Sequence, residues 1–173
     1  MSMSSENVVP ENMTLRFYGD PVLATPTSVI DEIDTSLGAL AEAMLEMMYA
    51  SRSVGLSANQ VGVSKRMFVY DIGEGPNVVI NPRITERSGK SIWDEGCLSF
   101  GEVFIDTQRA AKVHLEGMNL EGNPISIDAE DYLAEVLQHE VDHLDGKTML
   151  DRTSREKALA AKIELKRQRV GAS

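Results

Sequence analysis

The stretch QHEVDHLDG, residues 138–146, is the part of the sequence that says most about fold and function. It places His139 and His143 four residues apart, with Glu140 directly after the first histidine. On a helix, residues i and i+4 project from one face about one turn apart, so both imidazoles can reach a single ion. Glu140 can then hold its carboxylate beside that ion as a base. H-E-x-x-H has only three fixed letters, however, and two histidines on a half-buried helix without a metal explain a lone match equally well.

Two helices are predicted around this stretch. The segment 128–146 begins with acidic residues, which are typical of a helix N-terminus, and ends at Gly146, since glycine is typical of a helix C-terminus. A second helix, from 153 or 154 to about 169, has Leu159 and Ile163 as a thin apolar stripe. The quoted histidines therefore lie on the first of these helices.

A further helix and several strands are predicted upstream. Apolar residues at helical spacing, with Asp34 or Thr35 as N-cap, predict an amphipathic helix to about Ala50 whose methionines fill the core. Alternating or continuous apolar runs predict strands over 65–72 and 77–85, and a hairpin of 111–118 with 124–129. His114 on that hairpin is expected to face solvent or to be hydrogen-bonded.

These elements indicate one α+β domain. We expect mostly antiparallel sheets packed around a central helix that contains H-E-x-x-H, followed by the C-terminal helix over 153–169. Residues 1–12 are expected to be a flexible N-terminus, and 13–173 to form the domain.

Composition restricts the class of protein. The chain has 173 residues, of which 42% are hydrophobic and 25% charged, as in ordinary globular domains. No apolar run approaches the roughly 20 residues that span a bilayer, and the first residues do not resemble a secretory signal, so we expect a cytoplasmic protein without a membrane contact. Cys97 is the single cysteine, which excludes an internal disulfide.

The charge is distributed unevenly. A net charge of −10 argues against DNA binding, because a phosphate backbone repels such a surface. Residues 152–173 nevertheless contain seven Lys or Arg against two Glu. This segment is either a solvated helix face or a surface that docks on an acidic partner.

A catalytic metal site usually needs a third protein ligand, and two residues compete for that role. Glu164 follows His143 by 21 positions, but it lies in a basic segment typical of an exposed helix. Cys97 lies in WDEGCLSF, with glycine before it and Leu98-Ser99 after it. A lone cysteine is often only a buried, inert thiol, so the sequence pattern alone leaves this choice open.

Three motifs in fixed order resemble those of the peptide deformylases. That family has G-Φ-G-Φ-A-A-x-Q, then E-G-C-Φ-S, then H-E-Φ-D-H, where Φ is apolar. This chain has SVGLSANQ at 53–60, EGCLS at 95–99 and HEVDH at 139–143, and the resemblance extends from about Leu15 to the terminal helix. It implies a hydrolase that removes the N-formyl group from formylmethionine at the start of new polypeptides and releases formate.

The resemblance also implies the roles of the central residues. Cys97, His139 and His143 would bind one divalent ion, which is Fe²⁺ in most of the family, with Zn²⁺, Ni²⁺ or Co²⁺ as chemically admissible substitutes. Glu140 would accept the proton of the attacking water and return it to the leaving amine. The side-chain amide of Gln60 and the backbone N–H of Leu98 would stabilise charge on the formyl oxygen.

Supporting and substrate-binding residues follow from the same resemblance. Glu95 and Arg109 would form an ion pair that holds the cysteine loop, unless they are an ordinary strand pair, and Asp142 would orient a ligand or a loop. Candidates for a methionine pocket, with core packing as the alternative, are Val54, Trp93, Tyr132 and Val136. The substrate backbone would pair as an added strand near Val54 and Gly55 and with the segment after Ser99. The basic C-terminal helix resembles those of family members that contact the ribosome.

The first motif departs from the family twice. Ser53 stands in place of a glycine and would be strained if that position required positive φ, and Ser57 replaces an alanine. The segment 100–104 also lacks the proline or basic side chain that many relatives use for the peptide. These changes affect substrate positioning more than metal chemistry.

Two other functions compete with the deformylase. In a zinc endopeptidase, Glu164 would be the third ligand and internal peptide bonds would be cut. In an inactive deformylase-like protein, formylated chains or the ribosome would be bound without turnover, although Glu140 and Gln60 would then have no purpose.

Overall fold

The structure is a computed structural model that describes residues 13–171. The expected flexible segment 1–12 therefore lies outside the described residues. The helices are α1 (Thr35–Ala50), α2 (Asp131–Leu144) and α3 (Arg155–Gly171), with short 3-10 helices η1 (Pro21–Ala24), η2 (Ala58–Val61), η3 (Leu98–Phe100) and η4 (Met149–Arg152). The strands are β1 (Gly55–Ser57), β2 (Met67–Tyr70), β3 (Asn77–Ser88), β4 (Ser91–Gly96), β5 (Phe104–Arg109), β6 (Lys112–Met118) and β7 (Pro124–Glu130).

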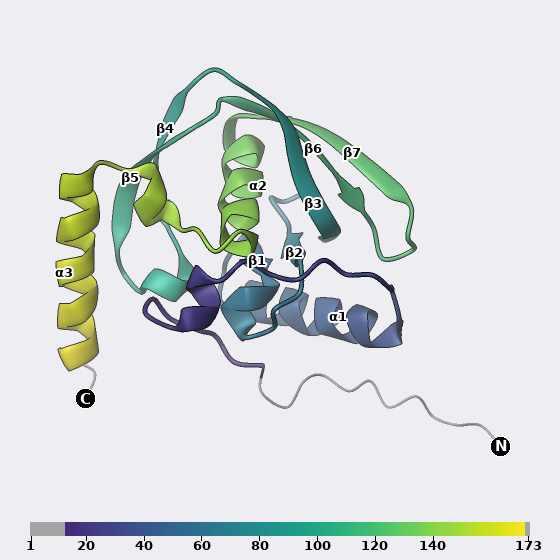
Figure 1. Cartoon of the computed structure of the whole chain (residues 1–173), viewed down its shortest axis with the longest axis horizontal. Coiled ribbons are helices and arrows are strands. Elements are labelled where there is room, and N and C mark those ends of the chain that lie inside the picture. Colours follow the sequence, from purple (N-terminus) through teal and green to yellow (C-terminus); the bar gives the residue numbers. More distant parts are fainter. Residues whose placement is uncertain (1–12, 172–173) are drawn as a thin grey trace.

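The strands form two antiparallel sheets. One has five strands in the order β1-β2-β3-β6-β7, and the other is the pair β4-β5. Figure 1 shows α2 in the middle of the molecule, between the β4-β5 pair and the strands β3, β6 and β7. The predicted α+β fold with a central helix is confirmed.

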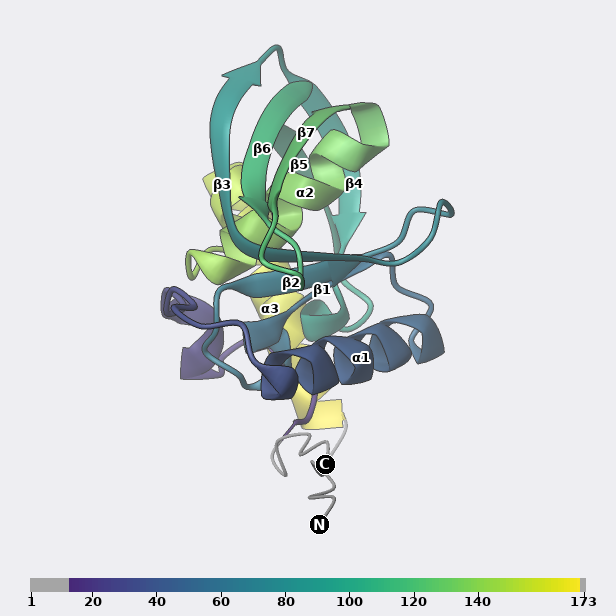
Figure 2. The ribbon, with the colours of Figure 1, turned by 90° about the vertical axis from the view of Figure 1, so that its right-hand side faces the viewer.

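Helix α1 covers the β1-β2 end of the larger sheet, as both ribbon views show (Figures 1 and 2). Its N-cap is Asp34, whose side chain accepts a hydrogen bond from the backbone N–H of Leu37 at 3.0 Å. Met44 and Met48 are completely buried in the cluster between this helix and the sheet. The predicted start of this helix and its methionine core are confirmed.

Helix α2 is buried along most of its length. Ala134, Leu137 and Val141 pack with strand residues such as Phe68 and Leu115. The predicted helix start at 128 is wrong: residues up to Glu130 belong to β7, where Lys112 pairs with Glu130. The acidic residues that suggested a helix N-terminus are instead the exposed end of an edge strand.

Helix α3 begins at Arg155 and packs on the smaller sheet, as expected for the C-terminal helix (Figure 1). Ala161 and Leu165 are buried in a cluster with Phe100 and Ile105. Leu159 and Ile163, the predicted apolar stripe, are more than half exposed, so the buried face lies on the other side of the helix. None of the described helices has the length and apolar character to cross a membrane.

Candidate metal centre

The two histidines and the cysteine meet where α2 passes the end of β4. Cys97 follows β4 directly, and both histidines lie in the C-terminal half of α2. Sγ of Cys97 lies 3.3 Å from Nε2 of His143, and the two Nε2 atoms lie 3.2 Å apart. Within residues 13–171, these three side chains form the one group whose ligand atoms all lie within 4.8 Å of one another.

This arrangement fits a small divalent cation. Metal–sulfur bonds of ~2.3 Å and metal–nitrogen bonds of ~2.0–2.1 Å in a tetrahedral site put the ligand atoms about 3.3–3.6 Å apart. The Nε2–Nε2 distance of 3.2 Å and the Sγ–Nε2 distance of 3.3 Å are only slightly shorter. One thiolate with two imidazoles is a donor set that suits zinc, iron, nickel or cobalt rather than magnesium or calcium.

His139 is oriented by Glu95. Nδ1 of His139 lies 2.7 Å from Oε1 of Glu95, so that Nε2 faces the cysteine. Burial lowers the pKa of His139, but hydrogen bonding to Cys97 and Glu95 outweighs it and holds this pKa well above its usual value. A ring that binds a cation through Nε2 has to give up that proton.

Glu95 itself belongs to a buried ion pair. Nε and Nη2 of Arg109 donate to the two carboxylate oxygens of Glu95 at 2.5 and 2.8 Å, and Thr107 donates a further hydrogen bond. Burial raises the pKa of Glu95, but Arg109 and His139 dominate and lower it to about 2. The carboxylate that orients His139 is therefore ionised.

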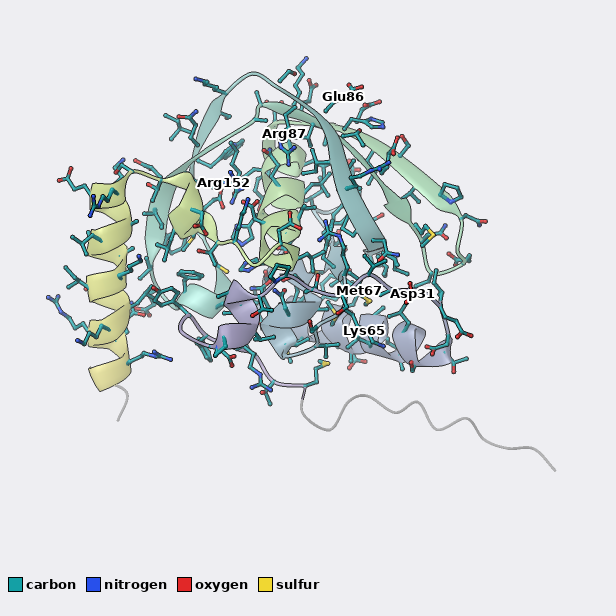
Figure 3. The ribbon with its side chains drawn as sticks, in the orientation of Figure 1. Asp31, Lys65, Met67, Glu86, Arg87 and Arg152 are labelled. Atoms are coloured by element: carbon teal, nitrogen blue, oxygen red, sulfur yellow. The ribbon has the colours of Figure 1, made fainter. Side chains whose placement is uncertain are left out.

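Arg109 also connects this pair with a second residue of α2, Asp142. Its Nη1 donates to Asp142 at 2.9 Å, and Arg152 of η4 donates to both oxygens of Asp142 at 2.8 and 2.9 Å. Figure 3 shows Arg152 extending from η4 toward α2. Burial raises the pKa of Asp142, and the two guanidinium groups lower it by more. The predicted supporting residues Glu95, Arg109 and Asp142 thus form one continuous network.

His143 is held differently. Its ring is buried, and no group within residues 13–171 forms a hydrogen bond with Nδ1. Asn59 of η2 donates to the backbone carbonyl of His143 at 2.5 Å, which ties the helix to the loop after β1. Burial, followed by the charge of His139, lowers the pKa of His143 well below its usual value. A neutral imidazole of this kind is the form that binds a metal.

Glu140 is a buried carboxylate without a structural partner. The residue is 4% exposed, and Oε2 has no hydrogen-bond partner among the described residues. Burial raises its pKa to about 7. The carboxylate lies against Gly55 of β1 so closely that an added Cβ would stand 2.6 Å from Oε1. Gly55 therefore makes room for the predicted base.

Gln60 is fixed in one orientation by Ser57. The backbone N–H and the hydroxyl of Ser57 both donate to Oε1 of Gln60 at 3.0 Å. The amide nitrogen consequently points the other way, 3.5 Å from Sγ of Cys97 and 3.1 Å from Oγ of Ser99. Leu98 is the first residue of η3, where backbone N–H groups have no partner within the helix.

The predicted pocket residues line one cavity of ≈ 600 Å³ beside the three candidate ligands. Trp93 and Tyr132 form one side, with their ring centroids 6.1 Å apart. The other predicted members that line the cavity are Val54, Gly55 and Val136. Gln60, Cys97, His139 and Glu140 open into the same cavity, so the structure brings the predicted site residues together.

The two departures in the first motif cause no backbone strain at Ser53. Within the described residues, positive φ occurs at the neighbouring Arg52, at 54°, and not at Ser53. The hydroxyl of Ser53 donates to the carbonyl of Gly55 at 2.9 Å. The Ser57 hydroxyl bonds to Gln60, as described above.

Glu164 takes no part in this site. It lies on α3, where its carboxylate is 3.4 Å from Arg167. Its place in the sequence, 21 positions after His143, is therefore a coincidence of spacing. Of the two residues that compete for the role of third ligand, Cys97 is the one whose ligand atom lies close to the two histidines.

Several site residues were not predicted from the sequence. Thr107 contacts Glu95, and Arg152 contacts Asp142, only because the tertiary fold brings them together. No local sequence pattern predicts these contacts. Phe104 also lines the cavity, with its ring against Gly96. Glu135, another lining residue, could have been found, because it precedes His139 by four positions and therefore lies on the same helical face.

Comparison with known proteins agrees with this geometry. The model of the family described as polypeptide deformylase matches residues 13–159. The peptide deformylase of Thermotoga neapolitana is 42% identical over 152 residues, which are 87% of this chain and 93% of that protein. The crystal structure of the Thermotoga maritima peptide deformylase has a TM-score of 0.80 at 41% identity, covering 82% of this chain and 97% of that one. For the Legionella pneumophila peptide deformylase the TM-score is 0.86 at 36% identity, covering 92% and 97%. The chain belongs to the polypeptide deformylase family.

Proposed function

We propose that Cys97, His139 and His143 hold one divalent metal ion and that Glu140 is the base with which this chain works on its substrate. The chain is a peptide deformylase: it removes the N-formyl group from the formylmethionine at the start of new polypeptides. The observation that supports these roles best is the convergence of one sulfur and two Nε2 atoms within 4.8 Å, beside the buried carboxylate of Glu140, whose Oε2 has no hydrogen-bond partner in the described part of the chain.

Ferrous iron, which the resemblance to the family implies, is the proposed native metal, and Zn²⁺, Ni²⁺ or Co²⁺ are ions that the same donor set accepts. When bound, a divalent ion there supplies a Lewis acid that polarises a carbonyl and makes water more acidic. Glu95 keeps His139 in the tautomer and orientation that this requires, and Arg109 keeps Glu95 ionised. Asp142 anchors Arg109 from the opposite side.

Glu140 moves the protons. Its carboxylate takes one proton from water as the water oxygen attacks the formyl carbon. It then gives a proton to the amine nitrogen as the C–N bond breaks, so that formate and a free N-terminus are released. The position of the carboxylate in the cavity, without a hydrogen bond to Oε2, leaves it available for this exchange.

Gln60 and Leu98 stabilise the charge that develops on the formyl oxygen. The amide nitrogen of Gln60 is directed at the cysteine side of the cavity because Ser57 occupies its oxygen. The backbone N–H of Leu98 lies at the start of η3, adjacent to Cys97. Two donors fixed before the reaction stabilise an oxyanion without reorganisation.

The cavity beside the metal ligands receives the methionine side chain. Trp93, Tyr132, Val136 and Val54 supply its apolar wall. Strand β1, which starts at Gly55, lies at the edge of the five-stranded sheet. An edge strand has unpaired backbone groups with which an extended peptide can pair, as can the segment after Ser99.

We extend the proposal to the setting in which the enzyme works. Residues 13–173 act as one domain that includes the C-terminal helix, because Ala161 and Leu165 of α3 pack on the core of the molecule. The enzyme acts in the cytoplasm, where formylated chains are made. The basic, exposed side of α3 contacts the ribosome.

One assay tests the residue roles. Protein purified without oxygen and loaded with ferrous iron is incubated with formyl-Met-Ala and with an unformylated peptide, and formate and new amines are measured. We expect formate from the first substrate alone, and its loss in Glu140→Ala with the metal retained. Formate production that persists in Glu140→Ala would exclude Glu140 as the base. Cleavage of internal bonds would indicate an endopeptidase, and metal-loaded protein without formate an inactive binder.

A further inference from the structure

One exposed cation borders the cavity and has no role in the mechanism above. Arg52 is the one lysine or arginine among the described residues that line the cavity. It directly follows Ser51, the C-terminal cap of α1, and it is exposed. Within residues 13–171 its guanidinium takes part in no ion pair or side-chain hydrogen bond. Arg52 is therefore available to an anionic group of a bound molecule.

Arg52 has a side chain at a position where the backbone favours glycine. Its φ is 54°, the left-handed conformation that often follows a helix C-terminus and that glycine adopts without strain. Apart from glycine, asparagine and aspartate are the residues that tolerate this conformation best. Strained residues of this kind cluster at functional sites, which supports a role for the arginine side chain itself.

The position of Arg52 relative to the proposed base determines which part of the substrate it meets. Gly55, the first residue of edge strand β1, lies against Glu140, and Gln60 follows the same strand. The formyl end of the substrate therefore lies at β1, and a peptide that pairs antiparallel with this edge runs back along the chain toward Arg52. If methionine lies opposite Gly55, the third and fourth substrate residues lie opposite Ser53 and Arg52.

We propose that Arg52 is a specificity-determining residue that binds acidic side chains at the third and fourth positions of the formylated substrate. This inference rests on the proposed function, because the cavity has to receive the start of a formylated chain. A guanidinium can pair with a carboxylate through two parallel hydrogen bonds, and it repels an ammonium group. The enzyme therefore favours chains with Asp or Glu at these positions over chains with Lys or Arg.

Asp94 is a lining residue of opposite charge, but it lies on the other side of the cavity. In β4 it alternates with Trp93 and Glu95, so its side chain projects from the other face of that strand. Its cross-strand neighbour is Asp106, which pairs with Lys157 of α3 at 2.9 Å. Asp94 therefore lies toward α3, and the exposed charge on the β1 side of the cavity is that of Arg52.

The test compares formyl-Met-Ala-Glu-Glu-amide with formyl-Met-Ala-Lys-Lys-amide in wild-type protein, Arg52→Asn and Arg52→Asp. Both replacements tolerate positive φ, so the charge changes while the backbone is kept. We expect the ratio of kcat/KM values, acidic over basic peptide, to exceed one in wild type. Arg52→Asn should lower this ratio by about 3- to 10-fold, and Arg52→Asp should lower it further. A ratio in Arg52→Asn equal to that of wild type would overturn the inference.

Two controls separate a charge effect from a structural one. Formyl-Met-Ala-amide ends before the third position, so its kcat/KM should stay within about twofold of wild type in Arg52→Asn, as expected for an exposed charge that it does not contact. Arg87→Asp makes the same change in net charge as Arg52→Asp, at an exposed arginine of β3 that does not line the cavity (Figure 3), and should leave the ratio unchanged. Salt at about 1 M should bring the wild-type ratio close to that of Arg52→Asn. A wild-type ratio that salt does not alter would contradict an ionic contact.

A binding measurement separates this inference from the proposed function. Dissociation constants for the two longer peptides are measured calorimetrically on metal-loaded protein in which Glu140→Gln blocks turnover, with and without Arg52→Asn. The preference for the acidic peptide should decrease in Arg52→Asn, as in the kinetic test. An unchanged preference would overturn the role of Arg52 even if formyl-Met-Ala-amide is deformylated normally. Absence of formate from wild-type protein would instead overturn the proposed function, and the binding ratio would still decide the role of Arg52.

Discussion

The substitution Gly55→Ala, which adds one methyl group beside Glu140, tests whether the proposed base has to lie where the structure places it. An added Cβ on Gly55 would stand 2.6 Å from Oε1 and 3.0 Å from the carboxyl carbon of Glu140, so the carboxylate has to move. A displacement of about 1 Å in a catalytic group costs on the order of 100-fold in rate. We therefore expect Gly55→Ala to lower kcat by about 100-fold, while the metal content measured by elemental analysis stays at one ion per chain.

Gly38 provides the control for that substitution. It lies in α1, and a Cβ added there meets nothing within 4 Å. Alanine is favoured over glycine inside a helix by about 1 kcal/mol, so Gly38→Ala should raise the unfolding temperature and leave kcat unchanged. Full activity in Gly55→Ala would show that Glu140 can act from another position.

At the scale of elements, Arg109 holds β5, β4 and α2 together. It lies on β5 and bonds to Glu95 of β4 and Asp142 of α2, with all three side chains buried. Its removal leaves two carboxylates buried near each other with too few partners, and breaking a buried ion pair in this way costs about 3–5 kcal/mol. We expect Arg109→Met to lower the free energy of unfolding by this amount in urea denaturation, and to weaken metal binding through the loosened His139.

The exposed pair of Arg83 with Glu116 is the comparison for Arg109. Its N–O distance is 2.9 Å, but the two side chains are 73% and 47% exposed. Pairs of this kind contribute about 0–1 kcal/mol. Arg83→Met should therefore change the stability by less than 1 kcal/mol, and a similarly small change in Arg109→Met would contradict the role of the buried network.

The hairpin β6-β7 contains a pH-dependent contact away from the metal. Asp128 lies 2.6 Å from Nδ1 of His114 and Ser126 bonds to Nε2 at 2.9 Å. The bond to Asp128 raises the pKa of His114; burial opposes this rise, and the charges of Asp128, Glu86 and Glu116 assist it. The pKa of His114 in the folded protein exceeds the unfolded value of 6.5. The stabilisation of the folded state by protonated His114 is therefore complete below pH 6.5 and is lost as pH rises through the folded pKa.

The difference in unfolding temperature between wild type and His114→Gln measures the pH-dependent stabilisation that His114 provides. It should be largest near pH 5.5 and decrease toward pH 8.5, in parallel with the imidazole titration followed by NMR. A difference that grows with pH would mean that the pKa of His114 is lowered in the folded state. The prediction that this histidine is hydrogen-bonded on a strand is confirmed by its two partners.

The elements that could be predicted from the sequence are those with a strong local period. Helices α1 and α2 and the hairpin were found because their apolar residues repeat at 3.6 or 2 positions. Strands β4 and β5 were missed, because Asp94, Glu95 and Gly96 break the apolar pattern and Ile92 and Phe104 face solvent. The candidate metal ligands were predicted from motifs, whereas the contacts of Thr107 and Arg152 depend on which elements pack together.

At the scale of the whole molecule, the candidate centre exists only when the chain is folded. Cys97 and His143 are 46 positions apart in sequence, and β5, β6 and β7 lie between them along the chain. Helix α2 packs against the five-stranded sheet, and its His139 and Asp142 bond to Glu95 of β4 and Arg109 of β5, which brings the histidines to the end of β4. An unfolded chain therefore binds a metal far more weakly than the folded protein does, and metal binding is linked to folding.

That linkage gives a prediction for the complete protein. A free metal concentration 1,000 times the dissociation constant stabilises the folded state by about 4 kcal/mol. For a domain of this length each kcal/mol raises the unfolding temperature by about 2–4 °C, so we expect a rise of about 8–16 °C in calorimetry between chelated and ferrous-loaded protein, without oxygen. Cys97→Ala removes one of three ligands and should reduce the rise to a few degrees, because its histidines alone bind weakly. An equal rise in Cys97→Ala would show that the stabilising ion binds elsewhere, since the thiolate would then contribute nothing to its affinity.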